Sequence, residues 1–136
     1  MAEFRVQRVV AKSVEEVWTA FTDADALASW FWPPRFATTV EVDLRVGGAY
    51  RIASATAGMA VSGEFTEVEA PGRLVQTWRW DGEDEETLVT MTFLPVDGGT
   101  GITILHERFA DPEQAAQNEL GWNSCLDRLG PAAPPQ

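Results

Sequence analysis

The sequence of 136 residues predicts an α+β protein, in which six or seven antiparallel strands pack against one long C-terminal helix. Apolar residues recur with the period of a helix near both ends of the chain, and they alternate with polar residues through residues 38 to 109. Gly and Pro clusters interrupt the alternating segment at short intervals, and strands joined by tight turns form antiparallel meanders. We therefore expect helices toward the two ends and a continuous sheet between them.

The first part of the chain predicts one strand followed by two short helices. Residues 3 to 10 read EFRVQRVV and alternate well enough for a strand. Ser13 and Glu16 have the spacing of a capping box, in which the serine caps a backbone N–H and the glutamate reaches back to the cap. The apolar residues of the next two turns fall on one helix face, and they are Val14, Val17, Trp18 and Phe21.

A second short helix is expected to begin at Thr22 or Asp23 and to end before Pro33. Proline lacks a backbone N–H donor and disfavours helix in the residue before it. The end of this helix is rich in aromatic residues, in the stretch LASWFWPPRF. Because the chain is acidic and this stretch has no flanking lysines, we do not expect it to contact a membrane.

Alternation with a period of two indicates the strands of the central segment. Their sequences in order are VEVDL, AYRIASA, VSGEFTEVE, RLVQTWRW, TLVTMTFLP and GITILHERF. Turn residues separate them, and these are Gly47-Gly48, Pro71-Gly72, Gly82 and Asp97-Gly98-Gly99. Gly63 lies inside a strand and is a candidate β-bulge.

The last element is predicted to be a long helix, with Asp111 as its N-cap and Pro112 in the first helical position. One stripe along this helix contains Ala115, Asn118, Trp122, Cys125, Leu126 and Leu129. Gly121 costs about 1 kcal/mol relative to alanine, so we expect the helix backbone to approach the sheet closely there. Residues 1 to 130 are expected to form a single domain and residues 131 to 136 a disordered tail.

Composition and charge exclude several classes of protein. The formal net charge of −11 disfavours nucleic acid and anionic membranes, which repel such a surface. The most acidic stretch is DGEDEE at residues 81 to 86, where we expect a solvated hairpin tip. No apolar run approaches the roughly 18 residues of a membrane span, and the N-terminus does not resemble a signal peptide. Cys125 stands alone and cannot form an internal disulfide, so the sequence predicts a cytoplasmic protein.

The order of elements and several local motifs resemble one known family. The motifs are VEEVWTAFTDADALASWF, DLRVGGAYRI, SGEFTEVEAPGRLVQTWRW, GGTGITILHERF and NELGWNSCLDRL, and the resemblance covers residues 3 to 129. These motifs resemble those of the Aha-type activators of a heat-shock ATPase, which belong to the START-like (SRPBCC) superfamily of polyketide cyclases and lipid carriers. The resemblance implies a helix-grip fold, with a curved sheet wrapped around the C-terminal helix. One scaffold hosts many activities, so this resemblance is specific for the fold and weak for function.

The resemblance also implies a cavity between the sheet and the C-terminal helix, open near the two short helices. The aromatic stretch LASWFWPPRF would then border the entrance, so we expect part of it to form core and the rest to form pocket rim. Trp30 and Trp122 match tryptophans that recur in the family motifs. Arg45, Gly47 and Gly48 match the RxGG hairpin of the family. None of these matches is a catalytic signature.

The residue types present argue against most kinds of catalytic site. One histidine and one cysteine cannot supply the usual ligands of zinc, and the glycine pairs lie in turns and not at a phosphate-binding junction. A serine or cysteine nucleophile needs an activating base, so Cys125 is expected to be a small buried apolar residue. We therefore expect no metal, no cofactor and no committed catalytic residue.

His106 is the one residue whose ordinary pKa suits proton transfer near neutral pH. Alternation places it on the same side of its strand as Ile102, Ile104 and Arg108, but the opposite side is also partly apolar. Its orientation is therefore open at this point. A structural histidine is favoured over a catalytic one, because perturbed groups are often structural.

Tryptophan is more frequent than a small core needs, with six in the chain. A buried indole N–H needs a hydrogen-bond partner, and a buried amide such as that of Asn118 must meet a polar group, a water or a ligand. We therefore predict a pocket that accepts an apolar, ring-bearing molecule. Its predicted lining contains Trp30, Tyr50, Trp78, Trp80 and Trp122, with Asn118 and His106 to orient the guest.

Three functions are compatible with these patterns. The first is a small-molecule binding domain for an apolar or aromatic ligand without committed chemistry. The second is a protein-interaction module of the Aha co-chaperone type, whose partner is another protein. The third is a cyclase- or hydrolase-like enzyme that uses His106 with a carboxylate such as Glu64 or Glu107.

Overall fold

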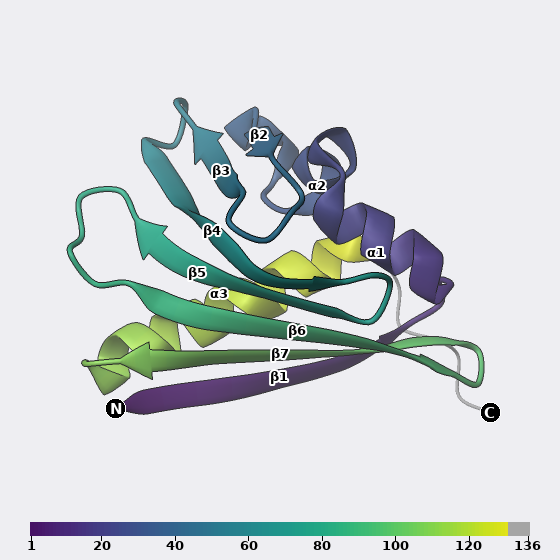
Figure 1. Cartoon of the computed structure of the whole chain (residues 1–136). Helices are drawn as coiled ribbons and strands as arrows, with labels where there is room; N and C mark the ends of the chain where they lie inside the picture. Colours follow the sequence, from purple (N-terminus) through teal and green to yellow (C-terminus); the bar gives the residue numbers. More distant parts are fainter. Residues whose placement is uncertain (131–136) are drawn as a thin grey trace.

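The computed structural model describes residues 1–130, which form seven strands, three α-helices and one 3-10 turn (Figure 1). In chain order, these elements are β1 (Ala2–Val10), α1 (Val14–Thr22), α2 (Ala24–Trp30), η1 (Pro34–Phe36), β2 (Thr39–Val42), β3 (Ala49–Ser54), β4 (Met59–Glu69), β5 (Arg73–Trp80), β6 (Thr87–Val96), β7 (Gly99–Phe109) and α3 (Pro112–Leu129). The predicted α+β class and order of elements are confirmed. The tail predicted for residues 131 to 136 lies outside the described residues.

The seven strands form one antiparallel sheet in the order β1-β7-β6-β5-β4-β3-β2. Strands β2 to β7 follow one another as a meander, whereas β1 pairs with β7 and so places the first strand beside the last. Helix α3 crosses one face of this sheet, and α1 and α2 lie toward one end of it (Figure 1). This is the helix-grip architecture, with the core between the sheet and the helices.

The local signals for the two short helices are confirmed. The Ser13 hydroxyl accepts a hydrogen bond from the Glu16 N–H, and the Glu16 carboxylate accepts one from the Ser13 N–H, both at 3.1 Å. Asp23 caps α2 by accepting from the Ala26 N–H at 3.0 Å. The chain leaves the helix after Trp30 and continues into η1 at the two prolines.

Two irregularities in the sheet differ from simple alternation. The bulge expected at Gly63 is wrong, because the register of β4 against β5 shifts between Phe65 and Glu67 instead. Glycine is needed at position 63 because β4 and β5 approach closely there, and a Cβ would collide with the Thr77 carbonyl of β5. In β7, Arg108 has a positive φ of 77°, and this turns Phe109 to the same buried side as His106.

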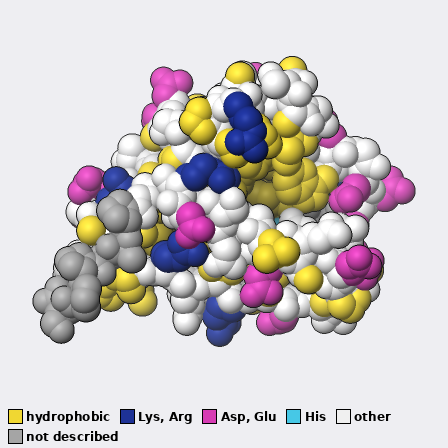
Figure 2. All heavy atoms as spheres, turned by 180° about the vertical axis from the view of Figure 1, so that it is seen from behind, with side chains coloured by type: hydrophobic (Ala, Val, Ile, Leu, Met, Phe, Trp, Pro, Cys, Tyr) yellow, Lys and Arg dark blue, Asp and Glu magenta, His cyan; other side chains and the backbone are white. Residues whose placement is uncertain are grey.

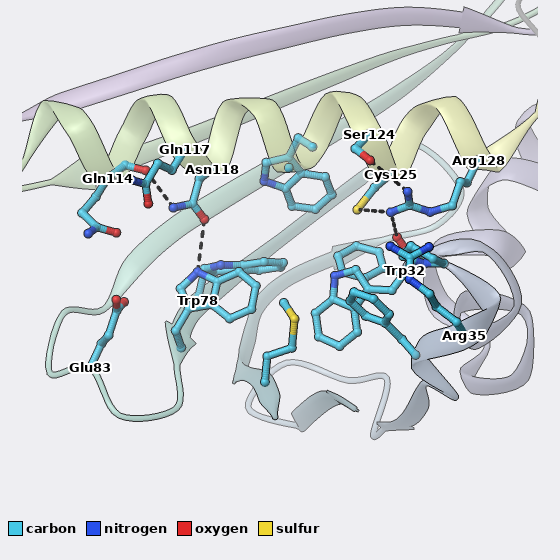
Figure 3. Close-up of a pocket in the computed structure, with 17 residues that line it drawn as sticks. Trp32, Arg35, Trp78, Glu83, Gln114, Gln117, Asn118, Ser124, Cys125 and Arg128 are labelled. Atoms are coloured by element: carbon cyan, nitrogen blue, oxygen red, sulfur yellow. Dashed lines mark hydrogen bonds between the residues drawn. The ribbon is translucent and has the colours of Figure 1, made fainter. Parts of the chain in front are cut away.

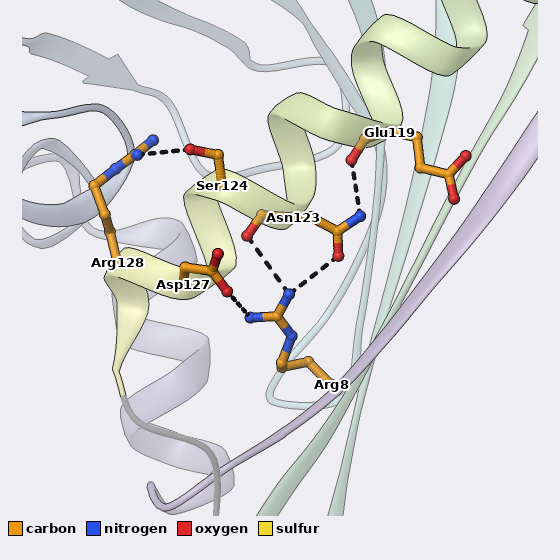
Figure 4. A network of polar contacts seen from close by, with 6 residues as sticks. All are labelled: Arg8, Glu119, Asn123, Ser124, Asp127 and Arg128. Atoms are coloured by element: carbon orange, nitrogen blue, oxygen red, sulfur yellow. Dashed lines mark hydrogen bonds and ion pairs between the residues drawn. The ribbon is translucent and has the colours of Figure 1, made fainter.

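Helix α3 is joined to the edge strand β1 by a polar cluster around Arg8 (Figure 4). The Arg8 guanidinium donates to Asp127 Oδ1 at 2.6 Å and to Asn123 Oδ1 at 3.0 Å. The Asn123 amide in turn donates to the Glu119 carbonyl within the helix. This cluster fixes α3 against β1 at the edge of the sheet.

The acidic stretch at residues 81 to 86 lies in the β5–β6 hairpin and is largely exposed, as predicted. It is not entirely free, since Asp81 pairs with Arg51 at 2.7 Å and the Glu85 carboxylate accepts from the Ala110 N–H at 2.8 Å. Within the described part of the chain, no helix is long and apolar enough to cross a membrane.

Candidate functional site

A pocket of about 540 Å³ lies between α3, the β5–β6 hairpin and the segment that connects α2 to β2. This volume falls within the range of roughly 300–1,000 Å³ that is typical of small-molecule sites. Its lining residues are Phe31, Trp32, Pro33, Arg35, Phe36, Met59, Trp78, Trp80, Glu83, Gln114, Gln117, Asn118, Gly121, Trp122, Ser124, Cys125 and Arg128. Viewed from the helix side, the hollow is visible as a patch of hydrophobic side chains (Figure 2).

Aromatic rings form most of the apolar wall of this pocket. Trp32 and Trp80 stack at 6.3 Å between ring centroids, with an angle of 19° between their planes. Phe31 meets Trp122 edge-on at 5.7 Å, and Trp78 lies 5.1 Å from Trp122. Because these rings hold one another in place, the wall is rigid and offers flat faces and edges to a guest molecule.

Helix α3 contributes two adjacent faces, and Trp122 and Cys125 at their border belong both to the core and to the pocket lining. The core face carries Ala115, Trp122, Cys125, Leu126 and Leu129, all buried. The adjacent face contributes Gln114, Gln117, Gly121, Ser124 and Arg128, which follow at helical spacing and line the pocket. The close approach expected at Gly121 is wrong, because a Cβ there would meet no atom within 4 Å. The glycine therefore widens the pocket.

Polar groups lie at the two ends of the pocket (Figure 3). At one end, the Trp80 indole donates to Asn118 Oδ1 at 3.2 Å, and the Asn118 amide donates to the Gln114 carbonyl at 2.8 Å. At the other end, Arg128 donates to the carbonyls of Trp30 and Phe31 at 3.2 and 2.7 Å, and so caps the end of α2.

Four of the seven residues predicted to line a pocket do line it, namely Trp78, Trp80, Asn118 and Trp122. Trp30 does not, because its indole turns into the core and donates to the Ala20 carbonyl at 2.9 Å. Tyr50 is also buried in the core, where its hydroxyl donates to the Thr77 carbonyl. Burial raises the pKa of this phenol, which stays protonated.

His106 lies beneath the pocket wall and is fully buried. The Trp122 indole donates to His106 Nδ1 at 3.1 Å, which places the imidazole proton on Nε2. This nitrogen lies 2.7 Å from the Thr87 hydroxyl, and the hydroxyl donates to the Trp78 carbonyl at 3.2 Å. Burial lowers the pKa of His106 to about 3. The imidazole is therefore neutral, and both of its nitrogens are occupied.

The residues considered for chemistry are not assembled into a catalytic group. Neither Glu64 nor Glu107 is hydrogen bonded to His106, whose partners are Thr87 and Trp122. Cys125 is buried, which raises the pKa of its thiol to about 12, and its Sγ accepts a contact from Arg128 at 3.6 Å. Among the described residues, no three His, Cys, Asp or Glu side chains are grouped as metal ligands would be.

A second hollow is larger, at about 630 Å³, but its composition differs. It lies between α1, α2 and the end of α3, and it contains Lys12, Glu15, Glu16 and Thr19 among its lining residues. No stacked aromatic wall is present in it. The pocket beside Trp80 is therefore the better candidate site, since ligand sites are mainly apolar with a few placed polar groups.

Several residues that surround this pocket were not predicted from the sequence. Met59 follows a turn whose position in space the sequence does not reveal, whereas Phe31, Trp32 and Phe36 belong to the stretch that was expected to form core and pocket rim. The residues of α3 could have been found, because Gln114, Gln117 and Gly121 repeat at helical spacing beside the apolar stripe. A polar row next to an apolar stripe usually means a solvated face, and here that face borders the pocket.

The fold and this pocket between sheet and helix define a START-like domain of the helix-grip class. The family model described as "Activator of Hsp90 ATPase homolog 1-like protein" matches residues 11–132. The chain therefore belongs to this family, as the sequence motifs indicated. No curated protein sequence matched the chain.

Several solved structures are similar over most of the chain. Protein CV1439 from Chromobacterium violaceum is 30% identical with a TM-score of 0.85, and all of both chains is covered. PFC0360w, an HSP90 activator from Plasmodium falciparum, is 27% identical with a TM-score of 0.73, over 90% of this chain and 88% of that one. DynU16, a protein in the dynemicin biosynthetic locus, is 26% identical with a TM-score of 0.81, over 93% of this chain and 45% of that one.

Proposed function

We propose that this protein binds a small, mainly apolar, ring-bearing molecule in the pocket beside Trp80. The observation that carries the proposal is the pocket itself, whose apolar wall of stacked rings faces the open position at Gly121. An ordinary helix residue at this position would reduce the space, and glycine costs the helix about 1 kcal/mol relative to alanine. Gly121 lowers the stability of the helix and makes no close contact with the rest of the protein. A ligand that occupies the space beside it would explain why a glycine is present there.

Binding without chemistry is favoured by the state of the titratable groups near the pocket. His106 is neutral, buried and hydrogen bonded at both nitrogens, so it has no free site for a substrate proton. The Cys125 thiol is protonated and buried. A general base must reach the proton it removes, and neither group meets this requirement in the arrangement described.

A protein-interaction role is the second candidate, and it is favoured by the family match and by the similarity to PFC0360w. Such a role would use the surface and would not need the pocket. The two candidates therefore differ in their response to a substitution that fills the pocket and leaves the outer surface unchanged.

The test is fluorescence titration with N-phenyl-1-naphthylamine, a neutral probe with a phenyl and a naphthyl group that brightens in apolar surroundings. We expect saturable binding to the wild-type protein and a loss of at least about tenfold in Gly121→Leu, because the leucine projects into the pocket. Ala116→Leu is the matched control, since Ala116 is exposed on the same helix and is outside the pocket lining.

Two outcomes would overturn the binding proposal: no saturable binding to the wild type, or equal binding to Gly121→Leu and Ala116→Leu. The rate of ATP hydrolysis by a heat-shock ATPase, measured with each variant present, tests the second candidate. Stimulation that is equal for the wild type and Gly121→Leu would favour the interaction role.

A further inference from the structure

The pocket has a cationic end, formed by Arg128 of α3 and Arg35 of η1. Arg128 directs its guanidinium to the carbonyls of Trp30 and Phe31, at the point where the chain enters the segment that carries Arg35. The two arginines are labelled at the same end of the pocket in the close-up view (Figure 3). Two positive charges therefore border one end of an otherwise apolar space.

Neither arginine is neutralised by a carboxylate within the described residues. Four other arginines form ion pairs, namely Arg8, Arg45, Arg51 and Arg73. Arg128 instead donates to two carbonyls, to the Ser124 hydroxyl at 2.9 Å and to the Cys125 sulfur. Arg35 lies over the Phe36 ring at 5.3 Å and remains exposed at the pocket mouth.

The opposite end of the pocket has a different character, with Gln114, Gln117 and the carboxylate of Glu83. Gln114 and Arg128 are 14 positions apart on α3, which corresponds to about 21 Å along the helix axis. In the space-filling view, basic side chains border one side of the apolar hollow, with an acidic side chain next to them, and acidic side chains lie on the other side (Figure 2). The pocket is therefore electrostatically asymmetric along its length.

We propose that the ligand is an amphipathic acid, whose ring-bearing body packs on Trp32, Trp80 and Trp122 and whose single anionic group lies at Arg35 and Arg128. The proposal rests on the proposed function, since it assigns the chemical class and orientation of the guest in the same pocket. Guanidinium groups suit carboxylate and sulfonate oxygens, because they offer several N–H donors in one plane. Glu83 at the far end repels an anion, so the reverse orientation is disfavoured.

The test compares two probes with the same rings: neutral N-phenyl-1-naphthylamine and 8-anilinonaphthalene-1-sulfonate, which adds one anionic group. We expect the sulfonate probe to bind the wild type more tightly. Arg35→Gln should weaken the sulfonate probe about fivefold and leave the neutral probe unchanged, whereas Arg35→Lys should retain most of the affinity. Arg35 makes no hydrogen bond that holds the fold, so both variants are expected to remain folded.

Arg79→Gln is the matched control, because Arg79 is exposed on β5 and is outside the pocket lining, and the substitution changes the net charge equally. If both probes bind equally, or if Arg35→Gln and Arg79→Gln have the same effect, the inference fails while the proposed function stands. If the neutral probe fails to bind or binds Gly121→Leu normally, the proposed function itself fails. A fivefold loss specific to the sulfonate probe and to Arg35→Gln supports the inference.

Discussion

Trp122 borders two regions that contain similar residue types and differ in their access to solvent. Behind it, its indole N–H, the His106 ring and the Thr87 hydroxyl form a closed chain of hydrogen bonds in the core. In front of it, the pocket is walled by rings and ends in amide, carboxylate and guanidinium groups that reach solvent. The side chain with useful proton chemistry is therefore sealed, and the accessible space contains no comparable group.

The buried side of Trp122 therefore contributes mainly to stability, and the pocket side is the part available for binding. The His106 region must remain intact because a buried donor or acceptor that loses its partner costs about 1–3 kcal/mol. At the pocket ends, Arg128 and Asn118 also hold the fold through hydrogen bonds, whereas Arg35 and Glu83 are exposed and form no side-chain hydrogen bond within the described residues. Substitutions on the two sides of Trp122 should therefore differ strongly in their effect on the free energy of unfolding.

The largest effect is expected for Trp122→Ala, which empties a core site and leaves His106 Nδ1 without its donor. We expect the free energy of unfolding to fall by about 3–5 kcal/mol, as measured by urea denaturation. Trp80→Ala should cost clearly less, because Trp80 is only half-buried at the pocket. Equal losses in the two variants would show that the core and pocket sides do not differ in the way described.

The next effect is the pH dependence that comes from His106. Its pKa is lowered from 6.5 to about 3 in the folded protein, whereas the unfolded chain takes up the proton near the ordinary value. Between these values the unfolded state binds more protons, so stability is retained above pH 6.5 and lost as the pH falls toward 3. We expect a loss of about 2 kcal/mol between pH 7 and pH 5, at about 1.4 kcal/mol per pH unit below the unfolded pKa.

Equilibrium unfolding at several pH values between 7 and 5 measures this slope while most carboxylates remain ionised. His106→Gln is the control, since glutamine supplies a donor and an acceptor and does not titrate. The variant should be less stable at pH 7 and should lose less stability on acidification. An unchanged slope would mean that other groups cause the pH dependence.

A smaller effect of the opposite sign is expected for Gly121→Ala. Alanine is favoured over glycine in a helix by about 1 kcal/mol, and a Cβ at this position meets no atom within 4 Å. We therefore expect a gain of about 1 kcal/mol and a higher melting temperature by differential scanning calorimetry. A loss of stability would mean that the helix backbone is more crowded there than the structure indicates.

The smallest effect is expected for Glu83→Gln at the far end of the pocket. Glu83 is exposed and makes neither a side-chain hydrogen bond nor an ion pair within the described residues. Its substitution should change the free energy of unfolding by less than about 0.5 kcal/mol in urea denaturation. A loss above about 1 kcal/mol would show that this end of the pocket contributes to the fold as the His106 region does.

The elements of the fold could be predicted because their signals are local. The capping box at Ser13 and Glu16, the cap at Asp111 and the alternating strands each depend on neighbours within a few residues. The family resemblance then implied that the sheet wraps around the C-terminal helix, whereas the pairing of β1 with β7 is seen only in the structure. Four pocket residues followed from this, because strand alternation places Trp78 and Trp80 on one face and the helix stripe places Asn118 and Trp122 opposite them.

The positions of the other site residues could not be predicted, because they are set by contacts with segments that are distant in the sequence. Trp30 could face the core or the pocket, and a hydrogen bond to Ala20 of the neighbouring helix decides for the core. His106 follows the strand alternation with Ile102 and Ile104, but the positive φ of Arg108 breaks it afterwards, so that Arg108 is exposed and Phe109 is buried. Gly121 was misjudged because a glycine in a helix predicts either close contact or open space, and only the opposite wall distinguishes them.

The cluster around Arg8 joins the two ends of the chain, and this affects the order in which the protein folds and unfolds. Arg8 and Asp127 are separated by 119 positions, and β1 also depends on β7 for its backbone pairing. The hairpins from β2 to β7 close short loops, whereas the attachment of β1 to α3 must wait for nearly the whole chain to collapse. The first strand and the last helix should therefore dock late, and their amide hydrogens should exchange together as one cooperative unit.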